Sequence, residues 1–304
     1  MVKRVLVTGV RGFVGRNVIA PLRRRGFEIH GTASRDDGVE GPTGARLHYG
    51  DLLASGVAAN IVAAVAPSHL LHLAWAPSGL RMRDPAENQA WAQASIELFD
   101  AFANLGGQRA VFAGTCAEYD WSHELLSEAT TPSKPMTVYG AAKNAVRESV
   151  EAASGRLPAG SAWARLFFLY GPYESSGRLV PDICAGLIEG RTVELTEGRQ
   201  QRDYLHAEDA AEVLAELLER DLRGTINVGS GEAVAVRDIA ILLGARAGRP
   251  DLLAFGRRPM APGDPPRLVA DTTRQSRELG FTPKYRLEAG LAQTLDWWRA
   301  EHHG

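Results

Sequence analysis

The chain has 304 residues, 45% hydrophobic content and a formal net charge of −2, with both signs of charge mixed along its length. These values suit one large domain or two interleaved ones, and no basic stripe favours a nucleic-acid partner. No apolar run reaches the length of a transmembrane helix, so we expect no membrane-spanning helix and no membrane partner.

Strand and helix patterns alternate from residue 2 to about 170, which predicts an α/β fold with a Rossmann-type, doubly wound parallel sheet. The expected strands cover residues 3–8, 27–32, 46–49, 69–73, 109–114 and 162–168. The expected helices cover residues 12–25, 56–66, 86–105, 137–154, 208–220 and 286–300. Glycine and proline become frequent after residue 172, which indicates a smaller, mixed C-terminal lobe that binds substrate. The expected parts are a dinucleotide-binding domain over 1–170, with its sheet completed within 205–230, and a substrate-binding lobe over 171–204 and 231–304.

An apolar strand, a glycine-rich loop and a helix open the chain. Residues 5–7 form the apolar run of a buried parallel strand, and apolar residues recur at helical spacing from residue 13. The glycines between them are three apart, which permits a tight turn, close approach to a pyrophosphate and close packing of helix on strand. The helix N-terminus would present free N–H groups to the phosphates. The predicted cofactor contacts are Gly9, Gly12, Phe13, Val14 and Gly15.

The end of the second expected strand selects between the two nicotinamide cofactors. A site for NAD would place Asp or Glu there to bind the ribose 2′-hydroxyl, whereas this chain continues with Ala33, Ser34 and Arg35. A serine hydroxyl and a guanidinium suit a 2′-phosphate, which is anionic and accepts several hydrogen bonds. We therefore predict NADP as the cofactor; NAD is the alternative if Arg35 is only a solvated loop residue.

The third and fourth expected strands lead into further candidates. Asp51 and Leu52 follow the third strand, where they would contact the adenine, although Asp51 would serve equally well as a helix cap. Leu73 and Ala74 end the fourth strand, at the edge where open parallel sheets bind ligands. The candidates for substrate contact after that strand are Trp75, Arg81 and Arg83. The alternative is a loop of solvated arginines.

Tyr139 and Lys143 lie four residues apart on the helix expected over 137–154, and so on one face of it. Such a pair is typical of a site where a phenol exchanges a proton while a nicotinamide carries a hydride. Each residue alone would also suit a solvated helix surface. The pair and the glycine loop together indicate an oxidoreductase site.

With these motifs the chain resembles the extended short-chain dehydrogenase/reductase family, in its group of nucleotide-sugar epimerases, dehydratases and reductases. The matching segments, in the family's order, are 8–15, 51–52, 72–74, 112–119, 139–143, 165–172, 202–204 and 263–264, with Asp271. The resemblance implies that Thr115 binds the substrate oxygen and that Tyr139 is the general acid or base. It also implies that Lys143 binds the nicotinamide ribose and favours the Tyr139 phenolate, lowering a pKa that is about 10 unperturbed. Tyr139 and Lys143 would thus contact the cofactor, and the implied assembly is a homodimer.

Departures from the family narrow the expected reaction. Dehydratases carry acidic residues just after the catalytic threonine, because water elimination needs a second acid and a second base. This chain has Cys116 and Ala117 there, and Glu118, expected on a strand, would point to the opposite face. Reduction and epimerisation remain, and the predicted NADP favours reduction. We predict a reductase of a nucleotide-linked 4-keto-6-deoxy sugar, with a 4-epimerase that keeps NAD bound as the alternative. A small-ketone reductase or a non-catalytic NADP sensor is a further possibility.

The substrate side follows the family only in part. Arg202 would contact the diphosphate of a nucleotide-diphosphate sugar, with Asp203 and His206 bracing its loop and Asp209 capping the next helix. Phe168 stands where many relatives have an asparagine that contacts substrate. The candidate substrate-binding residues are Trp75, Cys116, Arg178 and Arg202.

Cysteine and histidine usage suggests the compartment and the metal content. The two cysteines, Cys116 and Cys184, are too few for a disulfide framework and indicate a reducing compartment. A strand pattern starts at the N-terminus, which we interpret as leaving no room for a signal peptide, so we expect a cytoplasmic protein. The 8 histidines show no metal-ligand spacing, and we expect no metal.

Overall fold

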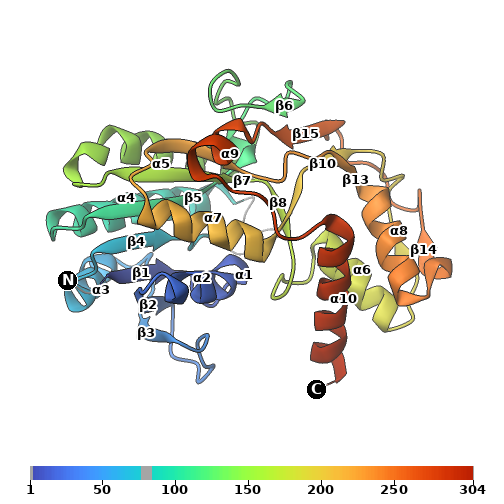
Figure 1. Ribbon diagram of the computed structural model, residues 1–304, viewed down its shortest axis with the longest axis horizontal. Coiled ribbons are helices and arrows are strands. Elements are labelled where there is room, and N and C mark those ends of the chain that lie inside the picture. Colours follow the sequence, from blue (N-terminus) through green and yellow to red (C-terminus); the bar gives the residue numbers. More distant parts are fainter. Residues whose placement is uncertain (1–2, 77–83, 304) are drawn as a thin grey trace.

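The computed structural model of the chain describes residues 3–76 and 84–303 and has a parallel sheet at its centre (Figure 1). The 7 strands follow the order β12-β7-β5-β4-β1-β2-β3, and each neighbouring pair is parallel. Their bounds are β1 (Arg4–Thr8), β2 (Glu28–Ala33), β3 (Ala45–Tyr49), β4 (His69–His72), β5 (Arg109–Thr115), β7 (Ser161–Leu166) and β12 (Gly224–Val228). The order reverses between β1 and β4, so the loops that follow these strands diverge and leave a crevice for ligands at their carboxyl ends.

Helices cover both faces of the sheet, because alternate strand residues point to opposite sides. Val5 and Val7 of β1 pack in one apolar cluster with residues of α1, α2 and α7, while Leu6 packs in another with residues of α3, α4 and α5. These helices are α1 (Phe13–Asn17), α2 (Ile19–Arg24), α3 (Val57–Val65), α4 (Pro85–Asn104), α5 (Val138–Ala152) and α7 (Ala207–Glu219). The expected doubly wound α/β fold is confirmed.

The helix expected over 12–25 is divided in two at Val18. Pro21 has no N–H group to donate to the carbonyl of Asn17, and its ring crowds that carbonyl. The single strand expected over 162–168 also divides: β7 ends at Leu166, and β8 (Phe168–Tyr170) pairs with β11 (Tyr204–His206) instead. At the division, Phe167 N–H donates to the Val228 carbonyl at 3.1 Å.

The C-terminal part forms a smaller body beside the main sheet, at the right of Figure 1. Its helices are α6 (Leu179–Ile188), α8 (Val236–Ala247) and α10 (Leu287–His303), which contact one another around an apolar cluster. A mixed 4-stranded sheet joins β13 (Val234–Ala235), β10 (Gln201–Arg202), β15 (Arg267–Ala270) and β6 (Leu125–Leu126). The remaining elements are β9 (Val193–Glu194), β14 (Leu253–Ala254) and α9 (Thr273–Leu279). The smaller mixed sheet is therefore confirmed, and α10 is the amphipathic helix expected over 286–300.

Candidate active site

Thr8, at the end of β1, fixes the loop that follows β4. Its hydroxyl oxygen accepts from the N–H groups of Leu73 and Ala74, both at 3.1 Å. Because both lone pairs are then used, the hydroxyl donates to Nδ1 of His72 at 2.8 Å. The His72 proton is therefore on Nε2, which donates to the Ser95 hydroxyl of α4 at 2.8 Å. Burial lowers the pKa of His72 to about 3, so a neutral imidazole holds this loop beside β1.

The glycine loop lies against the same segment. Gly9 has a φ of +68°, and a Cβ there would lie 3.0 Å from the backbone of Ala74. A Cβ on Gly15 would lie 2.2 Å from the Gly9 carbonyl oxygen, so glycine is needed for α1 to pack this closely on the loop. Gly12 begins α1, and no side chain in the described chain caps its first turn. Free backbone donors, including those of Phe13 and Val14, are therefore available to a pyrophosphate.

Two guanidinium groups lie near the segment after β2, that of Arg35 within the segment and that of Arg11 from the glycine loop. Ser34 is exposed, and the Arg35 side chain has a fractional exposure of 81%. Asp37 pairs with Arg11 of the glycine loop, whose Nη2 lies 2.8 and 3.1 Å from the two carboxylate oxygens. The hydrogen bond from Arg11 holds the pKa of Asp37 below its usual value. Arg11 was not among the predicted cofactor contacts, although its position within the glycine loop was a signal.

Asp51 and Leu52 lie after β3. Asp51 Oδ1 accepts from the N–H of Leu53 at 3.0 Å, so this carboxylate closes a local turn. The cap alternative for Asp51 is thus wrong for α3, whose N-cap is Gly56. Leu52 is buried in the core cluster with residues of α3 and α4.

Thr115 and Tyr139 come together because α5 packs closely on a short 3-10 helix, η2 (Cys116–Glu118). A Cβ on Gly140 would lie 2.2 Å from the carbonyl oxygen of Ala117, so the glycine after Tyr139 permits this approach. Thr137 caps α5 by accepting from Gly140 N–H at 3.0 Å. As a result, a hydrogen bond joins the side chains of Thr115 and Tyr139.

The protonation of Tyr139 differs from the sequence expectation. Burial raises the pKa of its phenol and the nearby charge of Glu118 raises it further, while the Thr115 hydrogen bond and Arg178 oppose this. The expected lowering is therefore wrong for the chain without ligands, because burial outweighs the effect of positive charges. Tyr139 is a protonated acid at neutral pH.

Lys143 is buried one turn further along α5, with 2% exposure. Its Nζ donates to the Ala113 carbonyl at 2.9 Å and lies 3.9 Å from the centre of the Trp75 ring. Burial lowers the pKa of Lys143 to about 7, and the charge of Glu118 opposes this shift. The candidate catalytic residues Thr115, Tyr139 and Lys143 therefore gather at one place.

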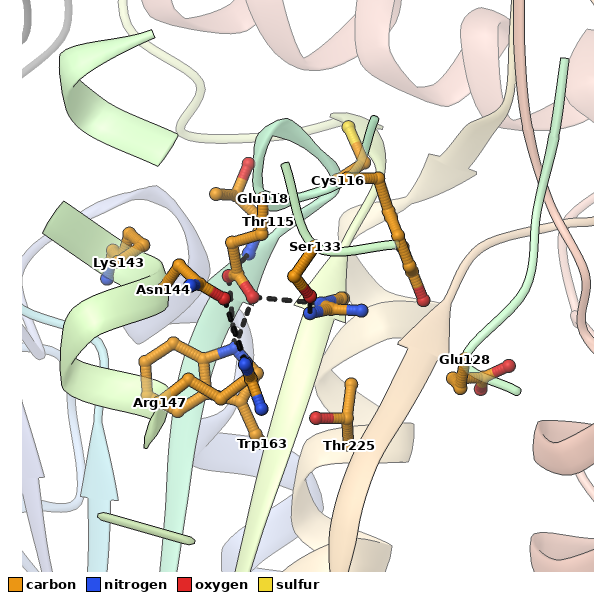
Figure 2. A network of polar contacts seen from close by, with 12 residues as sticks. Thr115, Cys116, Glu118, Glu128, Ser133, Lys143, Asn144, Arg147, Trp163 and Thr225 are labelled. Atoms are coloured by element: carbon orange, nitrogen blue, oxygen red, sulfur yellow. Dashed lines mark hydrogen bonds and ion pairs between the residues drawn. The ribbon is translucent and has the colours of Figure 1, made fainter. Parts of the chain in front are cut away.

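Glu118 overturns one expectation and explains the local geometry. It lies on η2 rather than on a strand, and its fully buried carboxylate accepts from Thr115 N–H at 2.7 Å. The same carboxylate accepts from Trp163 Nε1 at 3.0 Å and from Arg165 Nε at 2.8 Å. Figure 2 shows the Glu118 carboxylate between the Thr115 segment and Trp163. Because these donors occupy its oxygens, Glu118 is not free to serve as an acid or base.

Cys116 and Ala117 are buried behind Thr115. Burial raises the pKa of the Cys116 thiol to about 12, so it is not a nucleophile at neutral pH. Its carbonyl accepts from Trp121 Nε1 at 2.9 Å, and its side chain packs in an apolar cluster with Phe167. The positions where dehydratases need carboxylates therefore carry none.

Two of the substrate-side candidates, Arg178 and Arg202, lie on the C-terminal body. Arg202 Nη2 lies 2.6 Å from Asp264 Oδ1, and its guanidinium lies 5.6 Å from the Phe168 ring centre. Arg178 is exposed at the N-cap of α6, close enough to Tyr139 to favour its phenolate. Arg81 and Arg83 lie outside the described residues.

The bracing role of Asp203 is confirmed, whereas His206 takes the helix-cap role that was expected of Asp209. Asp203 accepts from the N–H groups of Ser230, Gly231 and Ala270 at 2.6, 2.9 and 3.1 Å, so it braces its loop as expected. His206 begins α7, and its Nδ1 accepts from the N–H at position 208 at 3.3 Å. Asp209 is not the cap of α7: it is buried and accepts from the N–H groups of residues 284 and 285 at 2.9 and 3.0 Å.

Two further features are absent from the part of the chain that the structure describes. No cluster of three or more His, Cys, Asp and Glu side chains is placed there to hold a metal ion. Within the same residues, no helix combines the length and the apolar character needed to cross a bilayer.

Comparisons with known proteins identify the family of this chain. A sequence profile of the NAD dependent epimerase/dehydratase family matches residues 5–229. The UDP-glucose 4-epimerase of Azospirillum brasilense is 27% identical over 98% of this chain and 92% of its own. The dTDP-6-deoxy-L-talose 4-dehydrogenase (NAD(+)) of Aggregatibacter actinomycetemcomitans is 27% identical over 77% of this chain and 86% of its own. The structure of the Thermus thermophilus UDP-glucose 4-epimerase in complex with NAD is 26% identical, with a TM-score of 0.87 over 97% of this chain and 99% of that chain. This chain belongs to the NAD dependent epimerase/dehydratase family, among extended short-chain dehydrogenases/reductases that act on nucleotide sugars.

Proposed function

We propose that this chain is an NADP-dependent reductase of a nucleotide-linked 4-keto-6-deoxy sugar, with hydride delivered to C4 and the proton given by Tyr139. The observation that carries the choice of cofactor is the end of β2. There, the exposed Ser34 and Arg35 stand where an NAD site would have an acidic residue. The first carboxylates come after them: Asp36, which accepts from Gly38 N–H at 3.2 Å, and Asp37, which is paired with Arg11. A 2′-phosphate would meet donors and positive charge at the end of β2, whereas a free 2′-hydroxyl would meet no carboxylate at the strand end itself.

The chain's residues fit this cofactor. Gly9 and Gly15 leave no room for a Cβ, and the first turn of α1 has free backbone donors, which suits a pyrophosphate. Leu73 and Ala74 would border the cofactor beside Gly9, Asp51 and Leu52 would lie toward the adenine, and Tyr139 and Lys143 would lie at the nicotinamide ribose. When bound, NADPH supplies the hydride.

Thr115 and Tyr139 would handle the substrate oxygen. Glu118 and Ala117 hold the threonine: Glu118 accepts from its N–H, and its Oγ1 accepts from Ala117 N–H at 3.2 Å. The Thr115 hydroxyl, which is hydrogen-bonded to Tyr139, would turn its proton to the oxygen of a keto sugar as negative charge develops there. The protonated Tyr139 would give its proton to that oxygen, and the charge of Lys143 would stabilise the phenolate that remains.

We also propose the placement of the sugar nucleotide. Residues 1–170 would hold the cofactor, and residues 171–204 and 231–304 would hold the nucleotide diphosphate. Arg178 and Arg202 would supply positive charge to the diphosphate, with Trp75 and Cys116 closer to the sugar. Phe168 removes the polar contact that many relatives have there. The active form would be a homodimer in the cytoplasm.

A 4-epimerase is the second candidate, and a specific observation favours it. The similarity to UDP-glucose 4-epimerases extends over nearly the whole chain. An epimerase would use the same three residues, with Tyr139 first accepting a proton from the sugar hydroxyl and later returning it. It would retain its cofactor between turnovers, and NAD would then be expected.

The test is NADPH oxidation by the pure protein with a panel of nucleotide 4-keto-6-deoxy sugars, with NMR of every product. Stoichiometric loss of NADPH with one of them supports the reductase and identifies the nucleotide. If 4-epimers interconvert without loss of NADPH, and NAD is released on denaturation, the reductase proposal is wrong and the epimerase replaces it.

A further inference from the structure

Trp75 contacts both members of the tyrosine–lysine pair. Its ring centre lies 3.9 Å from Lys143 Nζ and 6.1 Å from the Tyr139 ring centre, with an angle of 73° between the two ring planes. The indole Nε1 donates to Asn88 Oδ1 of α4 at 3.0 Å, and its ring stacks on Trp91 with centres 6.2 Å apart. Two contacts from α4 thus fix the ring orientation, and the indole face is presented to the ammonium group.

The surroundings of Lys143 make this contact important. The lysine is almost completely buried, and Ala113 supplies a single carbonyl for its three N–H donors in the described chain. The negative charge of Glu118, on η2, favours the charged form of Lys143. That carboxylate, however, already accepts from Thr115, Trp163 and Arg165. A buried ammonium with so few polar contacts tends to lose its proton.

Other titratable groups near Lys143 supply no compensating charge. His72, on β4, is neutral, and Tyr139, one turn earlier on α5, is a protonated phenol. The negative π face of an indole attracts a cation, and this attraction is strongest where water is excluded. The Trp75 ring is therefore the group best placed to complete the environment of the charged lysine.

We propose that Trp75 is a positioning residue, which holds the Lys143 ammonium against its indole face and keeps this lysine charged near neutral pH. Its importance for turnover rests on the proposed function, in which Lys143 stabilises the Tyr139 phenolate. Trp75 would then act through Lys143, in addition to any contact with the sugar.

The test is an NMR titration of the cofactor-free protein labelled with ¹³C at lysine Cε, with the Lys143 signal assigned by its loss in Lys143→Met. Trp75→Leu removes the π face and keeps an apolar side chain. Because the indole favours the charged form, its removal should lower the Lys143 pKa by about one unit. Trp75→Phe keeps a smaller π face and should lower it by less.

The matched control is Trp121→Leu, since the Trp121 indole donates to the Cys116 carbonyl and has no contact with Lys143 in the described chain. It should leave the Lys143 pKa unchanged. Circular dichroism and thermal melting identify variants that fail to fold, and Trp75→Phe keeps the test decisive if Trp75→Leu does not fold. An equal or higher Lys143 pKa in the folded Trp75 variants overturns the proposal.

This measurement requires neither cofactor nor substrate, so it is independent of the reductase assay. If the pKa falls as expected but no keto sugar is reduced, the Trp75 contact stands and the proposed function fails. If the reductase is active and the Lys143 pKa is unchanged in the Trp75 variants, the proposed function stands and the proposed role of Trp75 fails. If both proposals stand, the basic limb of the pH profile of kcat/KM should move to lower pH in Trp75→Leu. A purely structural role of Trp75 would not shift this limb.

Discussion

Replacing Glu118 with Gln should destabilise the fold strongly, although the two side chains have nearly the same shape. Glu118 and Arg165 have 0% and 4% exposed side chains and form a salt bridge of 2.8 Å. Oε1 accepts from Thr115 N–H, Oε2 accepts from Arg165, and Trp163 Nε1 lies 3.0 Å from both. In either orientation the amide NH₂ of Gln faces one of these donors, so Glu118→Gln loses at least one bond and leaves the Arg165 charge buried and unpaired.

The expected loss is about 3–5 kcal/mol of unfolding free energy, the usual effect of removing one partner from a buried pair. For a chain of this size it corresponds to a fall in Tm of roughly 10 °C. Urea and thermal unfolding followed by circular dichroism measure both quantities. Glu118→Leu combined with Arg165→Met should recover part of the loss, because it removes both charges.

The matched control is Glu148→Gln on α5, where Glu148 pairs with Arg147 at 3.4 Å and has a 64% exposed side chain. An exposed pair of this kind contributes about 0–1 kcal/mol, so this variant should unfold nearly as the wild type does. If Glu118→Gln is no less stable than Glu148→Gln, the reasoning about the buried network is refuted.

Four further changes test the site. Tyr139→Phe should abolish turnover while NADPH binding, followed by fluorescence, persists; an active variant would remove Tyr139 from its role. Gly15→Ala should weaken cofactor binding and lower Tm because its Cβ would overlap the Gly9 carbonyl, whereas the open position Gly155→Ala should change neither. Arg35→Ala should raise the Kd of NADP about tenfold or more and leave that of NAD nearly unchanged, and equal effects on both would count against NADP. Lys143 has a folded pKa of about 7, below the ordinary 10.5, so the unfolded chain binds more protons between these values. Wild-type stability relative to Lys143→Met should therefore rise from pH 7 to pH 10, and a flat difference would contradict the buried lysine.

The main architecture could be predicted because its signals are long and periodic. Expected strands such as 3–8 and 109–114 contain apolar runs, and the expected helices repeat apolar residues over several turns. The alternation of the two also places the carboxyl ends of the strands at one edge of the sheet. The convergence of Thr115, Tyr139 and Lys143 follows from this, although they come from different elements.

The small lobe could be predicted only in outline. Strands such as β10 and β13 have 2 residues each, too few for a period to be recognised. Their pairing depends on contacts between distant segments, as where β10 meets β15. The division of helix 12–25 did have a local signal, Pro21, whose missing donor interrupts the hydrogen-bond ladder.

The errors within the site concern side chains whose partners are distant in sequence. Glu118 comes soon after a strand, and its neighbours in sequence suggest that the strand continues. Its carboxylate instead accepts hydrogen bonds from Trp163 and Arg165 in the interior. Asp209 stands where a helix cap is common, yet backbone donors some 75 residues away take its carboxylate. In both cases a tertiary contact outweighs a local preference.

The protonation states of the site bear on the choice between reductase and epimerase. A reductase must start each turnover with a proton on its acid, whereas an epimerase starts by removing a proton from the substrate. Burial and Glu118 raise the pKa of Tyr139, and burial lowers that of Lys143, so both shifts favour the protonated phenol over the phenolate. A buried, protonated phenol is suited to giving a proton to a keto sugar. The raised pKa of Tyr139 therefore matches the first step of the proposed reductase, and an epimerase would need that pKa to fall when cofactor and substrate bind.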